Sequence, residues 1–129
     1  MVKVIIVAHG CLAPALLETA SNICCFEQKS VQAYSVSGRA DLDKISQNIK
    51  ASAQDAEVLV LADTFGGSSC NMALNCTNGM DNVKVVCGLN LNMLLAVLNN
   101  MSRLELPALA AKAVEDGKKA VFNATESVK

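Results

Sequence analysis

Residues 2–10 of the chain read Val2-Lys3-Val4-Ile5-Ile6-Val7-Ala8-His9-Gly10. Apolar residues on both faces are typical of a strand that is covered by helices on each side of its sheet. The run ends at His9, the only histidine among 129 residues. Such a strand carries its last side chain to the carboxyl edge of the sheet, where open α/β folds keep their chemistry. Imidazole can serve there as base, metal ligand or nucleophile, although position alone leaves an ordinary structural histidine equally open.

Three further apolar runs follow the first at regular intervals. They are Val31–Val36, Glu57–Ala62 and Val83–Cys87, so that the four runs start at residues 2, 31, 57 and 83. This spacing suits alternating strand–helix units. We therefore predict one doubly wound α/β domain over residues 1–129, with a mostly parallel four-stranded sheet of order 2-1-3-4 and helices on both faces.

Segments with helical periodicity separate these runs. The expected inward faces are Leu12, Leu16, Leu17, Ala20 and Ile23 in the first helix, Leu42, Ile45 and Ile49 in the second, Met72, Ala73 and Cys76 in the third, and Met93, Leu94, Val97 and Leu98 in the fourth. The third helix is expected to begin at Ser68 or Ser69, either of which suits an N-cap. A fifth helix has Pro107 in its first turn and is expected to stop at Gly117. The segment Ala120–Ala124 suits either a last helical turn or a short strand.

Composition excludes several classes of protein. With 52% hydrophobic and 18% charged residues, the chain is too apolar to be disordered. A net charge of -1 without a Lys/Arg cluster argues against a nucleic-acid surface. The apolar stretches fall far short of the roughly 20 residues that span a bilayer, and no signal-peptide cleavage site follows Met1. We therefore expect a soluble, cytoplasmic protein.

The chain has six cysteines, at positions 11, 24, 25, 70, 76 and 87. No C-x-x-C pair is present, and a single histidine cannot complete a paired Cys/His finger. Zinc bound by His9, Cys11 and Cys70 would lack any recognised ligand spacing. Because free cysteine behaves as a small buried apolar residue, we expect that role for Cys24, Cys76 and Cys87. We expect neither a metal nor a cofactor, and we note that Cys11 and Cys70 adjoin the candidate site.

Polar residues follow three of the predicted strands at one sheet edge. The segments are His9-Gly10-Cys11, Asp63-Thr64-Phe65-Gly66-Gly67-Ser68-Ser69 and Gly88-Leu89-Asn90. With strands one and three as neighbours, Asp63 ends within hydrogen-bonding range of His9. A carboxylate on one imidazole nitrogen fixes the tautomer and leaves the other nitrogen free to attack.

The Gly66-Gly67-Ser68 turn adds an anion site to this pair. Glycines let the backbone approach a ligand, and a helix N-terminus presents unpaired N–H groups. The set suits phosphoryl transfer through a phosphohistidine. Each part also has a plain structural reading: Asp63 as a loop anchor, the glycines as a tight turn, and Thr64 and Ser68 as turn and cap residues. No G-x-G-x-x-G, Walker or nucleophile-elbow pattern supports nucleotide binding or acyl transfer.

These segments resemble the IIA domain of the mannose-family sugar phosphotransferase system. The matching pieces are Val4-Ile5-Ile6-Val7-Ala8-His9-Gly10, Ala62-Asp63-Thr64-Phe65-Gly66-Gly67-Ser68 and Gly88-Leu89-Asn90-Leu91-Asn92-Met93-Leu94. Spacing and order agree over essentially the whole chain, residues 1–129. The resemblance implies that His9 is phosphorylated at Nε2, that Asp63 orients it, and that Gly10, Thr64, Gly66, Gly67 and Ser68 form the phosphoryl-binding loop.

The resemblance also implies partners. Such domains accept a phosphoryl group from phospho-HPr and pass it to a IIB domain, which serves a membrane sugar permease. They are typically homodimers that exchange a C-terminal strand, a role that would fall to Ala120–Ala124. Two departures concern prolines that are common in the family, because Ser69 and Asn92 stand in their places.

Three alternatives remain open from the sequence. A IIA-like phosphotransferase subunit of a dihydroxyacetone kinase would share the fold and the transfer step but use a kinase partner. A regulatory module would dock HPr and carry phosphate as a signal, without passing it on. A flavodoxin-like binding protein is disfavoured by the scarcity of aromatic residues, which make up 3% of the chain.

Overall fold

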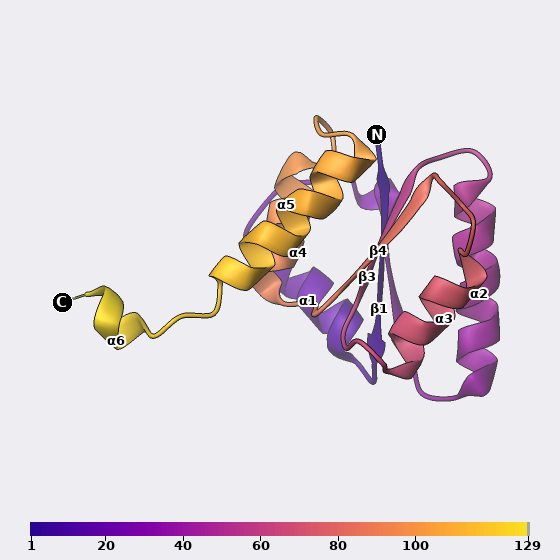
Figure 1. Ribbon diagram of the computed structural model, residues 1–129, viewed down its shortest axis with the longest axis horizontal. Coiled ribbons are helices and arrows are strands. Elements are labelled where there is room, and N and C mark those ends of the chain that lie inside the picture. The colour runs from indigo at the N-terminus through magenta and orange to yellow at the C-terminus, as the bar shows by residue number, and fades with distance from the viewer. Residues whose placement is uncertain (129) are drawn as a thin grey trace.

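Four parallel strands form the centre of the protein, in the order β2-β1-β3-β4. The computed structural model describes residues 1–128. Its strands are β1 (Lys3–His9), β2 (Val31–Val36), β3 (Val58–Ala62) and β4 (Val83–Cys87). The predicted α/β class, the parallel sheet and its strand order are confirmed. All four strands end at the same edge of the sheet, which is the lower edge in Figure 1.

Helices cover both faces of the sheet. They are α1 (Leu12–Ser21), α2 (Arg39–Ala53), α3 (Ser68–Cys76), α4 (Leu91–Asn100), α5 (Leu106–Lys119) and the short α6 (Ala124–Ser127), with the 3-10 turn η1 (Gln28–Ser30) before β2. Figure 1 shows α2 and α3 on one face, and α1, α4 and α5 on the other. The helices therefore make a three-layer α/β/α arrangement, as predicted.

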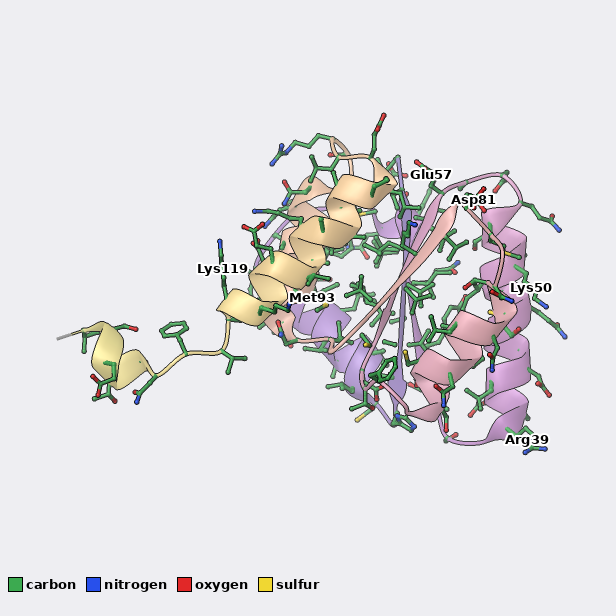
Figure 2. All side chains as sticks on the ribbon, viewed as in Figure 1. Arg39, Lys50, Glu57, Asp81, Met93 and Lys119 are labelled. Atoms are coloured by element: carbon green, nitrogen blue, oxygen red, sulfur yellow. The ribbon has the colours of Figure 1, made fainter. Side chains whose placement is uncertain are left out.

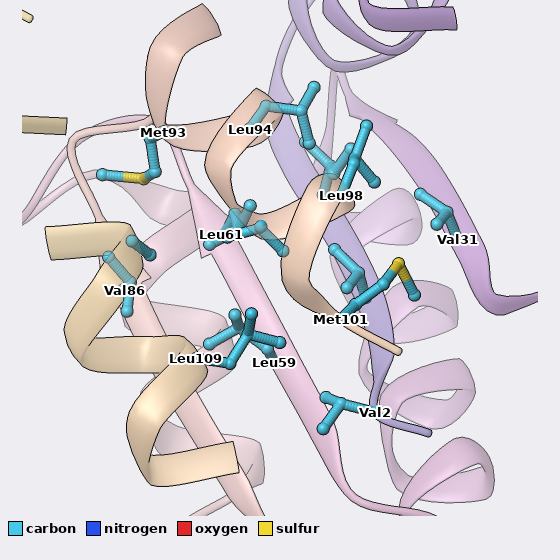
Figure 3. Close-up of a cluster of buried hydrophobic side chains, with 14 of the residues drawn as sticks. Val2, Val31, Leu59, Leu61, Val86, Met93, Leu94, Leu98, Met101 and Leu109 are labelled. Carbon is cyan, nitrogen blue, oxygen red and sulfur yellow. The ribbon is translucent and has the colours of Figure 1, made fainter. Parts of the chain in front are cut away.

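Side-chain alternation along the strands divides the core into two clusters. In β1, Val4 and Ile6 pack with α1, α4 and α5, whereas Ile5 and Val7 pack with α2 and α3. Figure 3 shows the first cluster, where Leu59 and Leu61 of β3 lie among side chains of α4 and α5. Because successive strand residues point to opposite faces, His9 falls on the same side as Ile5 and Val7, toward α2 and α3.

The prediction that Gly117 stops the fifth helix is wrong. Helix α5 continues through Gly117 to Lys119, and the glycine serves packing instead. A Cβ at this position would lie 2.8 Å from Met93 Cε and 3.3 Å from Met93 Cβ. The absence of a side chain lets α5 lie close against α4, a tertiary requirement that local C-cap preferences do not reveal.

Two expectations about helix boundaries also need correction. Ile23 was predicted on the inward face of the first helix, but α1 ends at Ser21 and Ile23 is exposed; Leu12, at the other end of α1, is exposed as well. Helix α3 begins at Ser68 as expected, yet its N-cap is Gly67, and no side chain caps it. Glycine fits this place because a Cβ here would lie 2.9 Å from Thr64 Oγ1.

The segment after α5 is neither a helical turn nor a strand. Ala120 is the C-cap of α5, residues 121–123 have no regular structure, and α6 begins at Ala124. Val121 and Phe122 are exposed, and Figure 1 shows this segment leading away from the body of the protein. Strand exchange between subunits stays a prediction. Within residues 1–128, no helix has the length and apolar character needed to cross a membrane.

Candidate functional site

The structure brings His9 and Asp63 together at the carboxyl edge of the sheet. His9 ends β1 and Asp63 directly follows β3, and these strands are neighbours in which Val7 pairs with Ala62. His9 Nδ1 lies 2.7 Å from Asp63 Oδ2. The backbone N–H of His9 donates to the same oxygen at 3.0 Å. The carboxylate therefore holds both the ring and the main chain of the histidine.

This contact decides the tautomer of the imidazole. A carboxylate oxygen is an acceptor, so Nδ1 carries the proton and Nε2 keeps its lone pair. The His9 side chain is 49% exposed, whereas Asp63 is only 12% exposed. No described residue forms a hydrogen bond with Nε2. The site thus presents a nucleophilic nitrogen to solvent, oriented from behind by a mostly buried carboxylate.

Asp63 is held as an anion. Burial alone raises the pKa of Asp63, but hydrogen bonds from the His9 backbone, the His9 ring and the Thr64 backbone outweigh it, so that the pKa is lower than its ordinary value of 3.8. The Thr64 N–H donates to Oδ1 at 3.0 Å, and both His9 bonds go to Oδ2. Each carboxylate oxygen accepts from a backbone N–H group, so replacing either oxygen with a donor such as NH₂ would remove a hydrogen bond.

The loop after Asp63 passes directly beside the histidine ring. Gly66 adopts φ +84°, a left-handed conformation that favours glycine. A Cβ at Gly67 would lie 2.9 Å from Thr64 Oγ1 and 3.4 Å from His9 Cε1. The side chain of Asn71 donates to the Gly66 carbonyl at 3.2 Å, which fixes the turn. The glycines therefore allow both the turn and the close approach to the imidazole.

The loop leads into the N-terminus of α3, as the sequence predicts. The first N–H groups of a helix have no partner within it, and they favour an anion. Ser68 opens the helix on the His9 side. Gly10, with φ +57°, turns the chain after His9, and its N–H donates to the Val36 carbonyl at 3.1 Å. Asp63, Gly67 and Ser68 thus lie beside the imidazole, and Gly10, Thr64 and Gly66 belong to the turns that lead to and from it.

A hollow of about 330 Å³ lies beside His9 and Ser68. Its other side is formed by the start of α2, including Arg39 and Leu42, which we did not predict from the sequence. Figure 2 shows Arg39 at the same edge of the sheet as the carboxyl ends of the strands, whereas Glu57 and Asp81 lie at the opposite edge. The sequence feature that could have indicated this side of the site is Ser37-Gly38, the polar turn that follows β2, the strand beside β1. A larger hollow of about 610 Å³ lies between α4 and α5, and its lining has no histidine or cysteine.

The third polar strand end does not join the site. Asn90 is the N-cap of α4, where its Oδ1 accepts from the Met93 N–H at 2.9 Å. Its Nδ2 donates to the Gly117 carbonyl at 3.1 Å. Asn90 therefore ties α4 to α5. Among residues 1–128, no three His, Cys, Asp or Glu side chains cluster as metal ligands, and the His9, Cys11 and Cys70 combination does not assemble.

Comparisons with known proteins agree with this fold. Residues 3–114 match the family EIIA-man, described as the PTS system fructose IIA component, where PTS is the phosphotransferase system. No curated protein matches the sequence. Among solved structures, the mannose/sorbose-specific IIA subunit from Enterococcus faecalis is 27% identical, with a TM-score of 0.78 over 94% of this chain and 92% of that one.

Two further structures share the fold. The PTS component EIIA from Streptococcus agalactiae has a TM-score of 0.86 at 23% identity, covering 98% of this chain and 99% of that one. The PTS IIA protein associated with the fucose utilization operon of Streptococcus pneumoniae has a TM-score of 0.77 at 21% identity, covering 99% and 96%. The match over residues 3–114 decides the family. This chain belongs to the EIIA-man family of PTS IIA components.

Proposed function

We propose that the protein is a phosphocarrier in which His9 accepts a phosphoryl group from phospho-HPr and passes it to a IIB domain serving a sugar permease. The observation that carries this proposal is the 2.7 Å contact between His9 Nδ1 and Asp63 Oδ2. It leaves Nε2 as an exposed nucleophile beside the start of α3. Family membership supports the same reaction class.

The proposed step is an in-line exchange between two histidines. The lone pair of His9 Nε2 attacks phosphorus, a new N–P bond forms, and the N–P bond to the donor histidine breaks. The proton on Nδ1 stays in place, and the Asp63 carboxylate stabilises the positive charge that the ring gains. The unpaired N–H groups at the start of α3 are directed to the phosphoryl oxygens. The protein contributes position and electrostatics, which phosphoryl transfer chiefly requires.

A reconstituted relay tests this proposal. The protein is incubated with phosphoenolpyruvate, enzyme I and HPr, and the expected product is acid-labile phosphate on the chain. Addition of a IIB domain should then discharge the label. Uptake that needs HPr, followed by discharge to IIB, supports a carrier. Uptake without discharge to any IIB domain would instead indicate a regulatory module.

We further propose that residues 1–129 act as one phosphocarrier domain, in the cytoplasm and as a homodimer. The exposed, adjacent Val121 and Phe122 support pairing with a second copy, because burying their apolar surface at an interface would be favourable. Neither the sugar nor the permease is defined by this domain. Sedimentation equilibrium of the purified chain measures the oligomeric state directly.

Gly67→Ala is expected to slow phosphoryl uptake by about tenfold or more, since a misplacement of about 1 Å can cost roughly 100-fold. The added methyl group would lie 2.9 Å from Thr64 Oγ1 and 3.4 Å from His9 Cε1, so the loop must move. The initial rate of uptake from phospho-HPr measures the effect. Gly38→Ala is the matched control on the far side of the same hollow, because it adds a methyl group there that meets nothing within 4 Å. Equal rates for Gly67→Ala and wild type would show that the loop does not position the reaction.

Phe65→Ser is expected to weaken docking of the phosphoryl donor. Phe65 is 79% exposed in the loop beside His9, and exposed aromatic side chains are frequent anchors of protein interfaces. We expect KM for phospho-HPr to rise about tenfold while kcat changes little, because Phe65 holds no reacting group. Ile23→Ser removes another exposed apolar side chain at the far end of α1 and should leave KM unchanged. An unchanged KM for Phe65→Ser would exclude this face as the docking surface.

A further inference from the structure

Two cysteines lie together beneath the candidate site. Cys70 is in the first turn of α3 and is only 1% exposed. Cys87 is the last residue of β4 and is partly buried. They are 17 positions apart in the sequence, and the mechanism above uses neither of them. All six cysteines of the chain are free thiols.

The fold turns these two side chains toward one another. Val83 and Val85 of β4 pack into the cluster formed by α2 and α3, and Cys87 continues this alternation on the same face. Ala73, one turn after Cys70, belongs to the same cluster. Cys70, in the first turn of α3, and Cys87, at the end of β4, therefore face the same layer between helix and sheet. In agreement with this placement, burial and then the neighbouring Cys87 thiol raise the pKa of the Cys70 thiol.

Both cysteines are also tied to the residues around His9. Gly66 lies four residues before Cys70, in the turn that leads into α3, and its backbone acts to lower the pKa of the Cys70 thiol. Cys87 pairs with Ala62, the residue before Asp63, and the N–H of Gly88 donates to the Asp63 carbonyl at 3.2 Å. A covalent link between the two sulfur atoms would therefore join the glycine loop to the strand beside Asp63.

We propose that Cys70 and Cys87 are an oxidative modification site, where a peroxide forms a reversible disulfide that restrains the glycine loop and slows transfer to His9. The effect on transfer rests on the proposed function, whereas the disulfide itself does not. Intracellular disulfides of this kind are typically transient and redox-sensing.

The chemistry needs one peroxide for each disulfide. Cys87, the more accessible thiol, attacks as its thiolate. A sulfur–oxygen bond forms, the O–O bond breaks, and the departing hydroxide takes up the thiol proton to become water. The Cys70 sulfur then attacks the Cys87 sulfenic acid, an S–S bond forms, and a second water leaves with the Cys70 proton. The two thiols supply the two electrons that reduce the peroxide.

The disulfide would move the glycine loop by shortening the distance between the Cys70 and Cys87 sulfur atoms. Disulfide sulfurs are about 2.05 Å apart, closer than two thiols in van der Waals contact. The first turn of α3 must therefore approach β4, and it carries Gly66 and Gly67 with it. We expect oxidised protein to accept phosphate about tenfold more slowly, because displacement on the scale of 1 Å weakens such positioning strongly.

Hydrogen peroxide treatment followed by mass spectrometry tests the proposal. We expect intact protein to lose two hydrogen atoms, peptide mapping to find Cys70 linked to Cys87, and dithiothreitol to restore both the mass and the rate of phosphate uptake. Cys87→Ser should abolish the link and the slowing. Cys24→Ser, which removes a thiol remote from the glycine loop, should show both.

Three results would overturn the proposal: two surviving thiols at positions 70 and 87, a link between other cysteines, or oxidised protein that accepts phosphate at the reduced rate. Failure of the proposed function is separately visible. If reduced wild-type protein takes up no phosphate at all, the phosphocarrier assignment fails, while the peptide map still decides whether the disulfide forms.

Discussion

His9→Ala is expected to reduce acid-labile phosphate on the protein to background. His9 is the only histidine in the chain, and its Nε2 is the nitrogen that the contact between Nδ1 and Asp63 leaves free. Without it no other imidazole can carry the phosphoryl group, so the loss is complete. The measurement is radiolabel retained after denaturing gel electrophoresis, compared before and after mild acid treatment.

The single histidine also makes this experiment unusually clean. In most proteins a residual signal could come from a second histidine, but here it could not. Because the His9 ring is half exposed, its removal costs mainly the bond to Asp63, on the order of 1.5–3 kcal/mol for a charged partner. Circular dichroism and a thermal unfolding curve should therefore show a folded variant. Acid-labile label that persists on folded His9→Ala protein would refute the assignment.

Most of the fold could be predicted because the strands are defined by local composition. Every residue of β3, Val58–Ala62, is fully buried. A short run that is apolar on both faces is typical of a central strand with helices on each side of the sheet. Gly117 shows the limit of this reasoning. Locally it looks like a helix stop, but the helix continues because the glycine accommodates Met93 of a different helix. The residues next to Gly117 in the sequence do not reveal how its helix packs against another helix.

The site residues also differ in how far the sequence alone predicts their positions. His9 and Asp63 could be brought together from sequence because parallel strands end at one edge, and strand order alone then makes them neighbours. The contribution of Arg39 depends on how α2 starts, and the proximity of Cys70 to Cys87 depends on the faces of α3 and β4. The sequence therefore identifies groups at strand ends, whereas groups that approach from helices require the packed structure.

Asp63→Asn is expected to slow phosphoryl transfer by about 100-fold or more while the protein still folds. Asp63 Oδ2 accepts from His9 and Oδ1 accepts from the Thr64 N–H. An amide offers only one oxygen, so its NH₂ must face a backbone donor on one side. If the NH₂ replaces Oδ2, it donates to Nδ1 and moves the ring proton to Nε2, which then cannot attack. A wrong tautomer of this kind lowers kcat about 10⁴-fold in a serine protease triad.

Stability provides an independent readout of the same substitution. Loss of one such hydrogen bond costs about 0.5–1.5 kcal/mol, so Asp63→Asn should unfold at lower denaturant concentration than wild type at pH 7. The pKa of Asp63 is lower in the folded protein than its ordinary value of 3.8. The ionised carboxylate therefore stabilises the fold fully at pH values above 3.8, and this stabilisation is lost as the pH falls through the lower pKa of the folded state. The difference between wild type and Asp63→Asn should therefore shrink under acid conditions. A difference that stays constant down to acid unfolding would show that the Asp63 carboxylate does not stabilise the fold as an anion. Transfer at the wild-type rate would remove Asp63 from the mechanism.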